Sequence, residues 1–314
     1  MTTLEPESGA APPSAQLLLE EAVLLCHAMV AHVAASNDVD VFFIKGPVSA
    51  LQGLRPPKVS VDVDVMVPPA SMAALTAALD LRGWRERPSE AESSAFPHHS
   101  VTLFHDDWPN NIDLHHRFPG MEAPAPDSFA KMWKRTQPAT LAGCRLQVPE
   151  RPLAIVFLAL HALRSPSRES GNVELDFLLS LELAALKSEI IHCATETGSL
   201  GALRPFLTSA FGEDCVPTWP SESAEWRNRR AVGAAGSLRA ISILSAGWKE
   251  RPKLVVRALA PSRDSILGAN LYSDMSAAGY VRNQARRWGR LLRALPQLTR
   301  DLRQFMADRS ARSE

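Results

Sequence analysis

Two aspartates, Asp62 and Asp64, stand two positions apart in the segment 59–67, which reads VSVDVDVMV. Valine or methionine alternates there with a polar residue, the period-two pattern of a strand with one apolar and one polar face. Both carboxylates therefore lie on the polar face, roughly 7 Å apart along the strand. Carboxylates this close repel each other and resist burial unless a cation lies between them. Hard oxygen ligands at this spacing predict a magnesium site suited to phosphoryl transfer.

A third carboxylate, Asp113, stands in a later segment with the same alternation. Its neighbours Ile112 and Leu114 are apolar, so the segment 111–117 (NIDLHHR) also predicts a strand with one polar face. If this strand pairs close to the first, three carboxylates share one face of a sheet. Such a triad can hold two metal ions while Asp113 helps to deprotonate an acceptor oxygen. The alternative is a set of surface strands whose polar faces meet water, although aspartate is depleted in strands.

Five histidines fall within 19 residues of each other: His98, His99, His105, His115 and His116. Alternate strand positions could gather two or three of them around zinc, which would make a histidine and aspartate metal centre. The segment contains no HxH or HExxH spacing. We therefore interpret His115 as a supporting partner of Asp113, and His98 and His99 as loop or strand-edge residues.

Two further residues that could take part in catalysis lie in apolar helical segments of the C-terminal half of the chain. His161 stands in the run FLALHAL, and Asp176 stands in the run VELDFLL. A hydrogen bond between them inside a core is one interpretation. The other places the pair in a cleft between two domains, where it would orient an acceptor or a base.

Residues 15–150 read as a mixture of helices and strands. An Ala- and Leu-rich segment without Gly or Pro predicts a first helix over 15–36, and β-branched and aromatic residues predict a strand over 39–45. The other expected elements are a turn at Gly46-Pro47 with a short helix over 48–54, a strand over 59–67, a helix over 69–83, a strand from Trp84, a hairpin of strands 99–105 and 111–117, a helix over 127–135 and a strand over 139–148. These elements predict an α+β fold with a small mixed β-sheet and helices packed on it.

Strand signals nearly vanish after Arg151. Helices are expected over 151–165, 173–198, 199–211, 222–246 and 276–308. This shift predicts an α-helical domain over 151–314 that follows a sheet-containing domain over 15–150. Residues 1–14 contain two adjacent prolines and no basic stretch before an apolar core, so they predict a disordered tail rather than a signal peptide.

The amino-acid composition indicates which binding partners the protein can have. The 314 residues are 46% hydrophobic and 22% charged, enough to bury a sizeable core. Lys plus Arg and Asp plus Glu both number 34, so the whole molecule offers no strong field, which argues against long nucleic acid. The exception is the segment 282–314, which contains nine arginines and only three acidic residues. This basic C-terminal helix is either a solvated face or a site for phosphate, RNA or an acidic peptide.

The cysteines and the apolar runs indicate the cellular compartment in which the protein is expected. The four cysteines, Cys26, Cys144, Cys193 and Cys215, lie far apart and form no CxxC pair, which favours a reduced, cytoplasmic setting. The longest apolar run, 152–163, is shorter than the roughly 20 residues that a bilayer requires. No membrane association is expected.

Taken together, the motifs resemble those of a known family. Lys45-Gly46 follows an apolar strand, Asp62-Val63-Asp64 follows about 15 residues later, a helix ends at Arg82-Gly83-Trp84, and a histidine-containing strand precedes Ile112-Asp113-Leu114-His115. This order resembles the uncharacterised nucleotidyltransferase family of the DNA polymerase β superfamily. The resemblance covers about residues 15–150, with weaker echoes at His161 and at 174–176.

The resemblance implies roles for individual residues. Asp62, Asp64 and Asp113 would be catalytic carboxylates that bind two Mg²⁺ ions, with Mn²⁺ as the alternative ion. Gly46 would mark the turn at which backbone amides approach the nucleotide phosphates. Lys45 would face phosphate or brace that turn. The expected nucleotide site comprises Lys45, Gly46, Ser49, Lys58 and Ser60.

Three positions depart from the family pattern. Pro47 stands where the wider superfamily has serine, which removes a hydroxyl and a backbone donor that Ser49 or Ser60 would have to replace. Lys58 stands where arginine is more usual, so a bidentate phosphate contact becomes a point charge. Asp113 stands where the family usually has glutamate, one methylene longer.

The expected function is that of a nucleotidyltransferase. The resemblance implies transfer of a nucleoside monophosphate from a nucleoside triphosphate such as ATP to a hydroxyl or phosphate, with release of pyrophosphate. The neutral chain favours a small molecule, sugar or peptide as acceptor, as in natural-product tailoring. The alternatives are transfer of a sugar unit onto a phosphorylated peptide, a non-catalytic nucleotide-binding module, and a His/Asp metal-dependent phosphoesterase.

Overall fold

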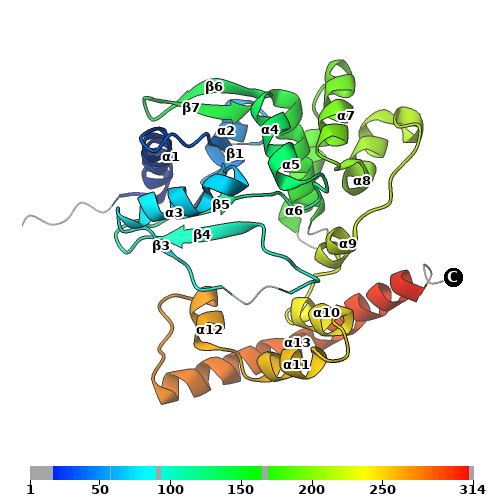
Figure 1. Ribbon diagram of the computed structural model, residues 1–314. Helices are drawn as coiled ribbons and strands as arrows, with labels where there is room; N and C mark the ends of the chain where they lie inside the picture. Colours follow the sequence, from blue (N-terminus) through cyan, green and yellow to red (C-terminus); the bar gives the residue numbers. More distant parts are fainter. Residues whose placement is uncertain (1–16, 57, 90–92, 165–168, 311–314) are drawn as a thin grey trace, which may run out of the picture.

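A computed structural model of the chain describes residues 17–56, 58–89, 93–164 and 169–310 (Figure 1). The tail expected over 1–14 lies outside these residues. The described chain is a mixed α/β structure, as the residue patterns predicted. It contains one small mixed sheet, helices on both faces of that sheet, and a separate layer of C-terminal helices.

The main sheet has five strands in the order β1-β2-β5-β4-β3. The strands are β1 (Phe42–Ile44), β2 (Asp62–Met66), β3 (Arg85–Glu86), β4 (Ser100–Phe104) and β5 (Asn111–His115). β2 and β5 are parallel, and the other three neighbouring pairs are antiparallel. The predicted hairpin is therefore confirmed as β4 and β5, while β2 is shorter than the strand expected over 59–67.

One face of the sheet packs against the N-terminal helices and a small hairpin. The valines of β2 and Ile112 and Leu114 of β5 are buried in one core with apolar residues of these elements. The elements on this side are α1 (Leu19–Ala35), α3 (Met72–Asp80), which follows the 3-10 turn Pro69–Ser71, and the hairpin β6 (Thr136–Leu141) and β7 (Cys144–Pro149). This core accounts for the apolar half of the predicted alternation.

The opposite face of the sheet meets the central helix α5 (Arg151–Leu163). Nearly every residue of α5 is buried, and it shares a core with Phe42, Ile44 and Met66 of the sheet. The apolar run thus lies inside the protein, and no described helix has the length and apolarity that a bilayer crossing requires. Around α5 lie α4 (Ala125–Trp133), α6 (Glu169–Leu179), α7 (Lys187–Glu196), α8 (Leu200–Phe211) and α9 (Ala224–Arg230). The short helix α2 (Gly46–Leu51) packs against β1 and β2.

The helix expected over 173–198 is two helices. α6 ends at Leu179, and α7 begins at Lys187 after a 3-10 turn. The Ser180 hydroxyl donates to the Phe177 carbonyl at 2.7 Å, which competes with continuation of the helix. Leu183 lies in the interrupted segment and is buried, so the break also lets the chain return to the core.

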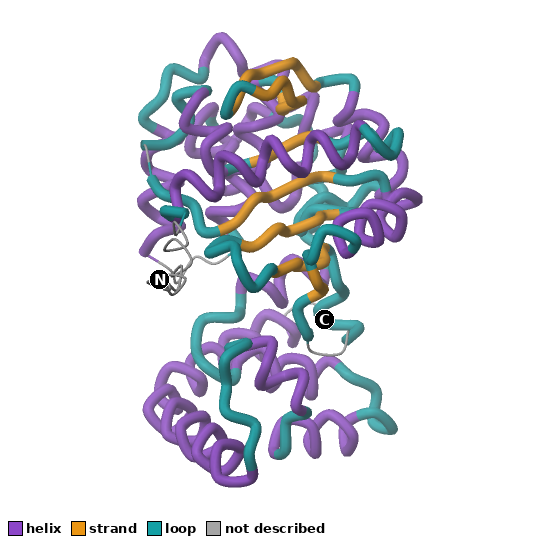
Figure 2. Tube along the Cα trace, turned by 90° about the vertical axis from the view of Figure 1, so that its left-hand side faces the viewer, coloured by secondary structure: helices purple, strands orange, loops and turns teal. Residues whose placement is uncertain are grey.

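The last helices form a layer of their own beyond the edge of the sheet at which β4 and β3 lie, seen below it in Figure 1 and in the lower half of Figure 2. They are α10 (Ser237–Ser245), α11 (Arg251–Leu259), α12 (Arg263–Ala269) and α13 (Ala277–Ser310). The helix expected over 222–246 is divided at Gly236, whose φ of +95° is left-handed. α11 and α12 were not predicted, and Phe96 and Ile241 join this layer to the sheet-containing part.

Candidate active site

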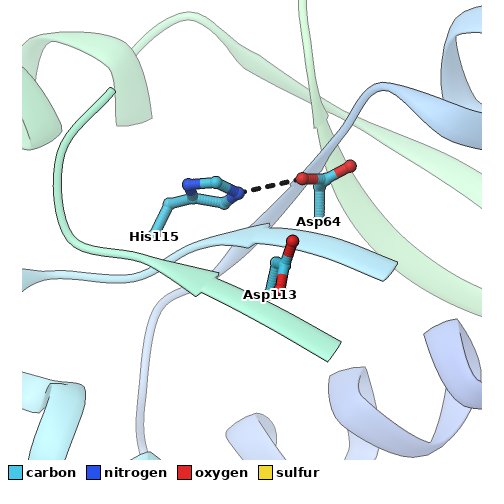
Figure 3. A group of neighbouring side chains, drawn as sticks. All are labelled: Asp64, Asp113 and His115. Atoms are coloured by element: carbon cyan, nitrogen blue, oxygen red, sulfur yellow. Dashed lines mark hydrogen bonds and ion pairs between the residues drawn. The ribbon is translucent and has the colours of Figure 1, made fainter. Parts of the chain in front are cut away.

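Asp64 and Asp113 are direct partners on the neighbouring parallel strands β2 and β5. Asp62 lies two residues before Asp64, and His115 lies two residues after Asp113. Because side chains alternate along a strand, all four project from the same face of the sheet. Figure 3 shows Asp64, Asp113 and His115 converging from the two strands. The expected convergence of the three aspartates on one face is therefore present.

Asp64 is the buried member of this group, with 5% of its surface exposed. Lys45 Nζ lies 2.6 Å from its Oδ1, and the Nε2–H of His115 donates to the same oxygen at 2.9 Å. Burial alone would raise the pKa of Asp64, but Lys45 and His115 outweigh it and hold that pKa below its usual range. The carboxylate is thus ionised. The prediction that His115 supports Asp113 is wrong, because its ring bonds to Asp64.

Asp62 is half-buried and experiences the opposite balance. Burial, followed by the negative charge of Asp64, raises the pKa of Asp62 to about 6, with Lys45 opposing and Asp113 adding to the rise. The three carboxylates of Asp62, Asp64 and Asp113 therefore carry more negative charge than Lys45 compensates. A cation bound at this face would relieve that repulsion.

Asp113 is oriented by its other neighbour strand. Thr102 on β4 is its register partner, and the Thr102 hydroxyl donates to Asp113 Oδ1 at 2.6 Å. One oxygen of Asp113 is therefore held in place, which leaves the second for other contacts. Thr102 carried no motif in the sequence, and only the strand pairing brings it to the site.

The donor set fits a divalent metal ion. Within the described residues, one ligand atom each from Asp64, Asp113 and His115 lie within 4.8 Å of one another. Asp62 is not in this tightest group, although it shares the face. His115 Nδ1 is buried and has no hydrogen-bond partner among the described residues. Two or three carboxylate oxygens on one wall are the hard ligands that magnesium and manganese prefer.

The turn after β1 is strained. Lys45 has φ 59° and ψ −158°, a conformation that is almost exclusive to glycine, and Gly46 follows with φ +50°. A Cβ atom at Gly46 would lie 3.0 Å from the Ser60 hydroxyl. Such strain costs about 1–3 kcal/mol and persists where surrounding structure enforces it. Here it directs the Lys45 ammonium to Asp64 and brings Ser60 against the turn.

The remaining predicted nucleotide-binding residues differ in their surroundings. Ser49 is buried in α2, one turn after Gly46. Lys58 is exposed in the segment before β2. Pro47 occupies the second position of α2, where a missing N–H leaves no intrahelical bond unmade. The proline is therefore compatible with the local backbone.

The histidine cluster is only partly assembled. The rings of His99 and His115 have centroids 5.7 Å apart. His105 lies elsewhere, against Trp84 and the Gly83 turn. Among the described residues, the metal-ligand group contains one histidine, so the arrangement differs from a multi-histidine zinc site.

The predicted pairing of His161 with Asp176 is wrong. The Nδ1–H of His161 donates to Glu174 Oε2 at 2.7 Å, while Asp176 is exposed on the other side of α6. Both candidates follow apolar residues in the same helix, so sequence spacing alone did not separate them. Burial first, and Lys45 in part, lowers the pKa of His161, which places the pair within electrostatic range of the site.

Arginines from distant segments surround His99, and none was predicted. Arg117 and Arg229 both bind Glu225, with N to O distances between 2.7 and 2.9 Å. Burial, followed by the charge of Arg229, lowers the pKa of His99. Basic residues scattered over more than 100 positions carry no local signal. Only the tertiary structure brings Arg117 and Arg229 together beside His99, where they share Glu225.

A family model described as an uncharacterised nucleotidyltransferase matches residues 16–185. No curated protein gives a significant match. The solution structure of the antibiotic-resistance factor ANT(2'')-Ia is similar, with a TM-score of 0.38 and 17% sequence identity over 56% of this chain and 91% of that chain.

The family match covers more than half of the chain. It includes all seven described strands, the strained turn and the three aspartates. The chain therefore belongs to the family of uncharacterised nucleotidyltransferases.

Proposed function

We propose that the protein transfers a nucleoside monophosphate from a nucleoside triphosphate to a hydroxyl or phosphate of a small molecule, sugar or peptide. Pyrophosphate is the second product. The observation that carries this proposal is the register of β2 and β5, which sets Asp64 beside Asp113 on the face that Asp62 shares. Three carboxylates on one wall suit the metal-assisted charge neutralisation that phosphoryl transfer requires.

In this proposal Asp62, Asp64 and Asp113 hold magnesium, with two ions expected and manganese as the alternative. Burial, followed by the negative charge of Asp64, raises the pKa of Asp62, and a cation at this position would relieve both effects. Bound magnesium would supply charge neutralisation for the triphosphate. Asp113, oriented by Thr102, would accept the proton of the acceptor oxygen.

The strained turn supports a phosphate-binding role for its residues. Lys45 is the closest cation to Asp64, and its flexible side chain can reach from the carboxylate toward a phosphate oxygen. Gly46 leaves open the space that a Cβ would fill, and Ser60 adds a hydroxyl beside it. Ser49 and Lys58 complete the proposed nucleotide site.

The two halves of the chain have different roles in this proposal. Residues 15–150 form the nucleotidyltransferase domain, and residues 151–314 form an α-helical acceptor-binding domain that ends in the basic helix α13. The proposed boundary lies between β7, which ends at Pro149, and α5, which begins at Arg151. The core around α5 joins the domains tightly, so movement is expected in the α10–α13 layer rather than at this boundary.

One observation favours a second candidate function. The group of Asp64, Asp113 and His115 mixes carboxylate and imidazole donors, which also suits zinc or manganese in a phosphoesterase. Stoichiometric zinc or manganese in the purified protein, together with no pyrophosphate release from any triphosphate, would support this candidate.

Titration calorimetry with ATP, GTP, CTP and UTP tests the main proposal, in the presence and absence of magnesium. Asp62→Ala and Asp64→Ala should each lose magnesium-dependent binding, whereas Asp106→Ala should keep it. Asp106 lies in the exposed turn between β4 and β5 and controls for the loss of one negative charge. Unchanged nucleotide binding in both site variants would refute the proposal.

A further inference from the structure

An imidazole and carboxylate pair, His161 and Glu174, lies outside the proposed metal and nucleotide sites. His161 lies on α5 and Glu174 lies on α6, and the Nδ1–H of the ring donates to Glu174 Oε2 at 2.7 Å. The side chain of Glu174 is 14% exposed, whereas that of His161 is 36% exposed. The pair is therefore enclosed around the carboxylate and accessible to a ligand around the ring.

The second ring nitrogen of His161 can bind a ligand. Glu174 occupies Nδ1–H, and among the described residues no group forms a hydrogen bond with Nε2. The bond to Glu174 fixes the orientation of the ring and favours its protonated form. Nε2 is therefore a hydrogen-bond acceptor when the ring is neutral and a charged donor when the ring is protonated.

Packing of aromatic rings places His161 near the strained turn. Phe157 lies four residues before His161 on α5, so the two side chains share one face of the helix. The ring of Phe157 packs edge-on against Phe118, with centroids 4.9 Å apart, and Lys45 Nζ lies 5.7 Å from the centroid of Phe118. This row of contacts leads from Lys45 at the turn to the face of α5 that carries His161.

Cations surround the pair. Lys45 and Arg164 lie within electrostatic range of the ring of His161. Arg55 and Lys45 lie within electrostatic range of Glu174. Burial first, and then the two cations near the ring, lower the pKa of His161 against the opposing effect of Glu174. The ring is therefore neutral near pH 7, and the cations around it would attract an anion.

We propose that His161, as an imidazolium stabilised by Glu174, binds the pyrophosphate end of the nucleoside triphosphate through Nε2. The inference rests on the proposed function, because it names a further binding residue for the same substrate. The α-phosphate must meet the carboxylates of β2 and β5, where transfer takes place. His161 lies within range of Lys45 instead, so it is assigned to the β- and γ-phosphates, which leave as pyrophosphate.

Binding of the triphosphate would reverse the electrostatic balance at His161. The negative charges of the phosphates outweigh Lys45 and Arg164 and raise the pKa of His161, so the ring takes up a proton. Nε2–H then donates a charge-assisted hydrogen bond to a phosphate oxygen, while Nδ1–H stays bonded to Glu174. When the bond to the α-phosphorus breaks, the imidazolium stabilises the negative charge that develops on pyrophosphate.

Titration calorimetry of the full chain with magnesium pyrophosphate tests this proposal. The heats measured in two buffers that differ in ionisation enthalpy give the number of protons taken up on binding. The wild type should take up about half a proton more than His161→Asn near pH 7. His161→Asn should also bind pyrophosphate about tenfold more weakly, the loss expected for one hydrogen bond to a charged group. His192→Asn, on the exposed face of α7, should match the wild type in both respects.

Two measurements separate a binding role of His161 from a structural one. Asparagine keeps an N–H for Glu174 but is too short to reach a ligand at Nε2, so His161→Asn should keep the melting temperature of the wild type. The pKa of the His161 ring, followed by NMR, should rise by about 1 or more when magnesium pyrophosphate binds. In the bound state this pKa should be lower in Glu174→Gln than in the wild type and unchanged in Asp176→Asn.

The outcomes distinguish this inference from the proposed function. Equal affinity and equal proton uptake in the wild type and His161→Asn would overturn the inference, as would a wild type that does not bind pyrophosphate. If Asp64→Ala still loses magnesium-dependent nucleotide binding in that case, the proposed function stands. A wild type that binds no nucleotide, but whose His161 ring gains a proton with pyrophosphate, would refute the proposed function and leave an anion site at His161.

Discussion

Lys45 Nζ lies 2.6 Å from Asp64 Oδ1, and both side chains are at most 10% exposed. The ion pair joins the residue with the most strained backbone at the site to its most buried carboxylate. Lys45 also lies over the ring of Phe118, 5.7 Å from its centroid, which shields the ammonium from water. Lys45 is thus the cation that compensates Asp64 in this structure.

Lys45→Met should destabilise the metal-free protein by about 3 kcal/mol, because it leaves the buried Asp64 carboxylate without its ion pair and with only the His115 hydrogen bond. Magnesium should then raise the melting temperature of the variant more than that of the wild type, since the ion supplies the missing positive charge. Differential scanning calorimetry with and without magnesium measures both effects. Lys253→Met, on the exposed face of α11, is the control. Equal increases in all three proteins would contradict this account of Lys45.

Gly46→Ala should lower the affinity for nucleoside triphosphate at least tenfold, because the new Cβ meets the Ser60 hydroxyl inside the phosphate turn. Gly53→Ala is a matched control: Gly53 also has a positive φ, of +66°, but nothing lies within 4 Å of its added Cβ. Both variants should lose about 1 kcal/mol of stability from the left-handed backbone. Nucleotide affinity that falls equally in the two variants would show that the contact with Ser60 is irrelevant.

Glu174→Gln and Asp176→Asn distinguish the observed partner of His161 from the predicted one. Glu174 raises the pKa of His161 through its hydrogen bond, against the larger lowering effect of burial. The pKa of His161 should therefore fall further in Glu174→Gln and stay constant in Asp176→Asn. NMR titration of the His161 ring measures it. A pKa that moves only in Asp176→Asn would favour the sequence-based pairing.

His27 should make folding sensitive to mild acid. Its ring is buried on α1, Nδ1–H donates to the Val23 carbonyl at 2.7 Å, and burial lowers its pKa to about 4. Between pH 6.5 and about 4 the unfolded chain binds a proton here that the folded chain does not, so stability falls as the pH falls. The total loss is about 3 kcal/mol.

Urea unfolding at several pH values checks this expectation. His27→Phe keeps the packing against Phe43, whose ring lies 5.2 Å away, and should remove about 3 kcal/mol of the pH-dependent loss. His32→Phe, on the exposed face of the same helix, should leave the dependence unchanged. Identical pH profiles for the wild type and His27→Phe would show that other groups account for the loss.

Much of the sheet was predictable because strand periodicity is local. The alternation around Asp62 and Asp64 assigned them to one face of β2, and the same reasoning placed Asp113 and His115 together on β5. Helix boundaries were harder to predict in the C-terminal half of the chain. The breaks at Ser180 and Gly236 depend on a side-chain hydrogen bond and a left-handed residue that the apolar pattern does not reveal.

The sequence by itself determined which residues have the chemistry and which face of their own strand they occupy, since both follow from residue type and period-two geometry. Tertiary structure decided which of them meet. The pairing of Asp64 with Asp113 spans 49 positions, and Lys45, His115 and Thr102 reach the carboxylates only through strand order and register. Likewise, His161 and Glu174 meet because α5 packs on α6. Such distances are set by packing between elements, which no local pattern encodes.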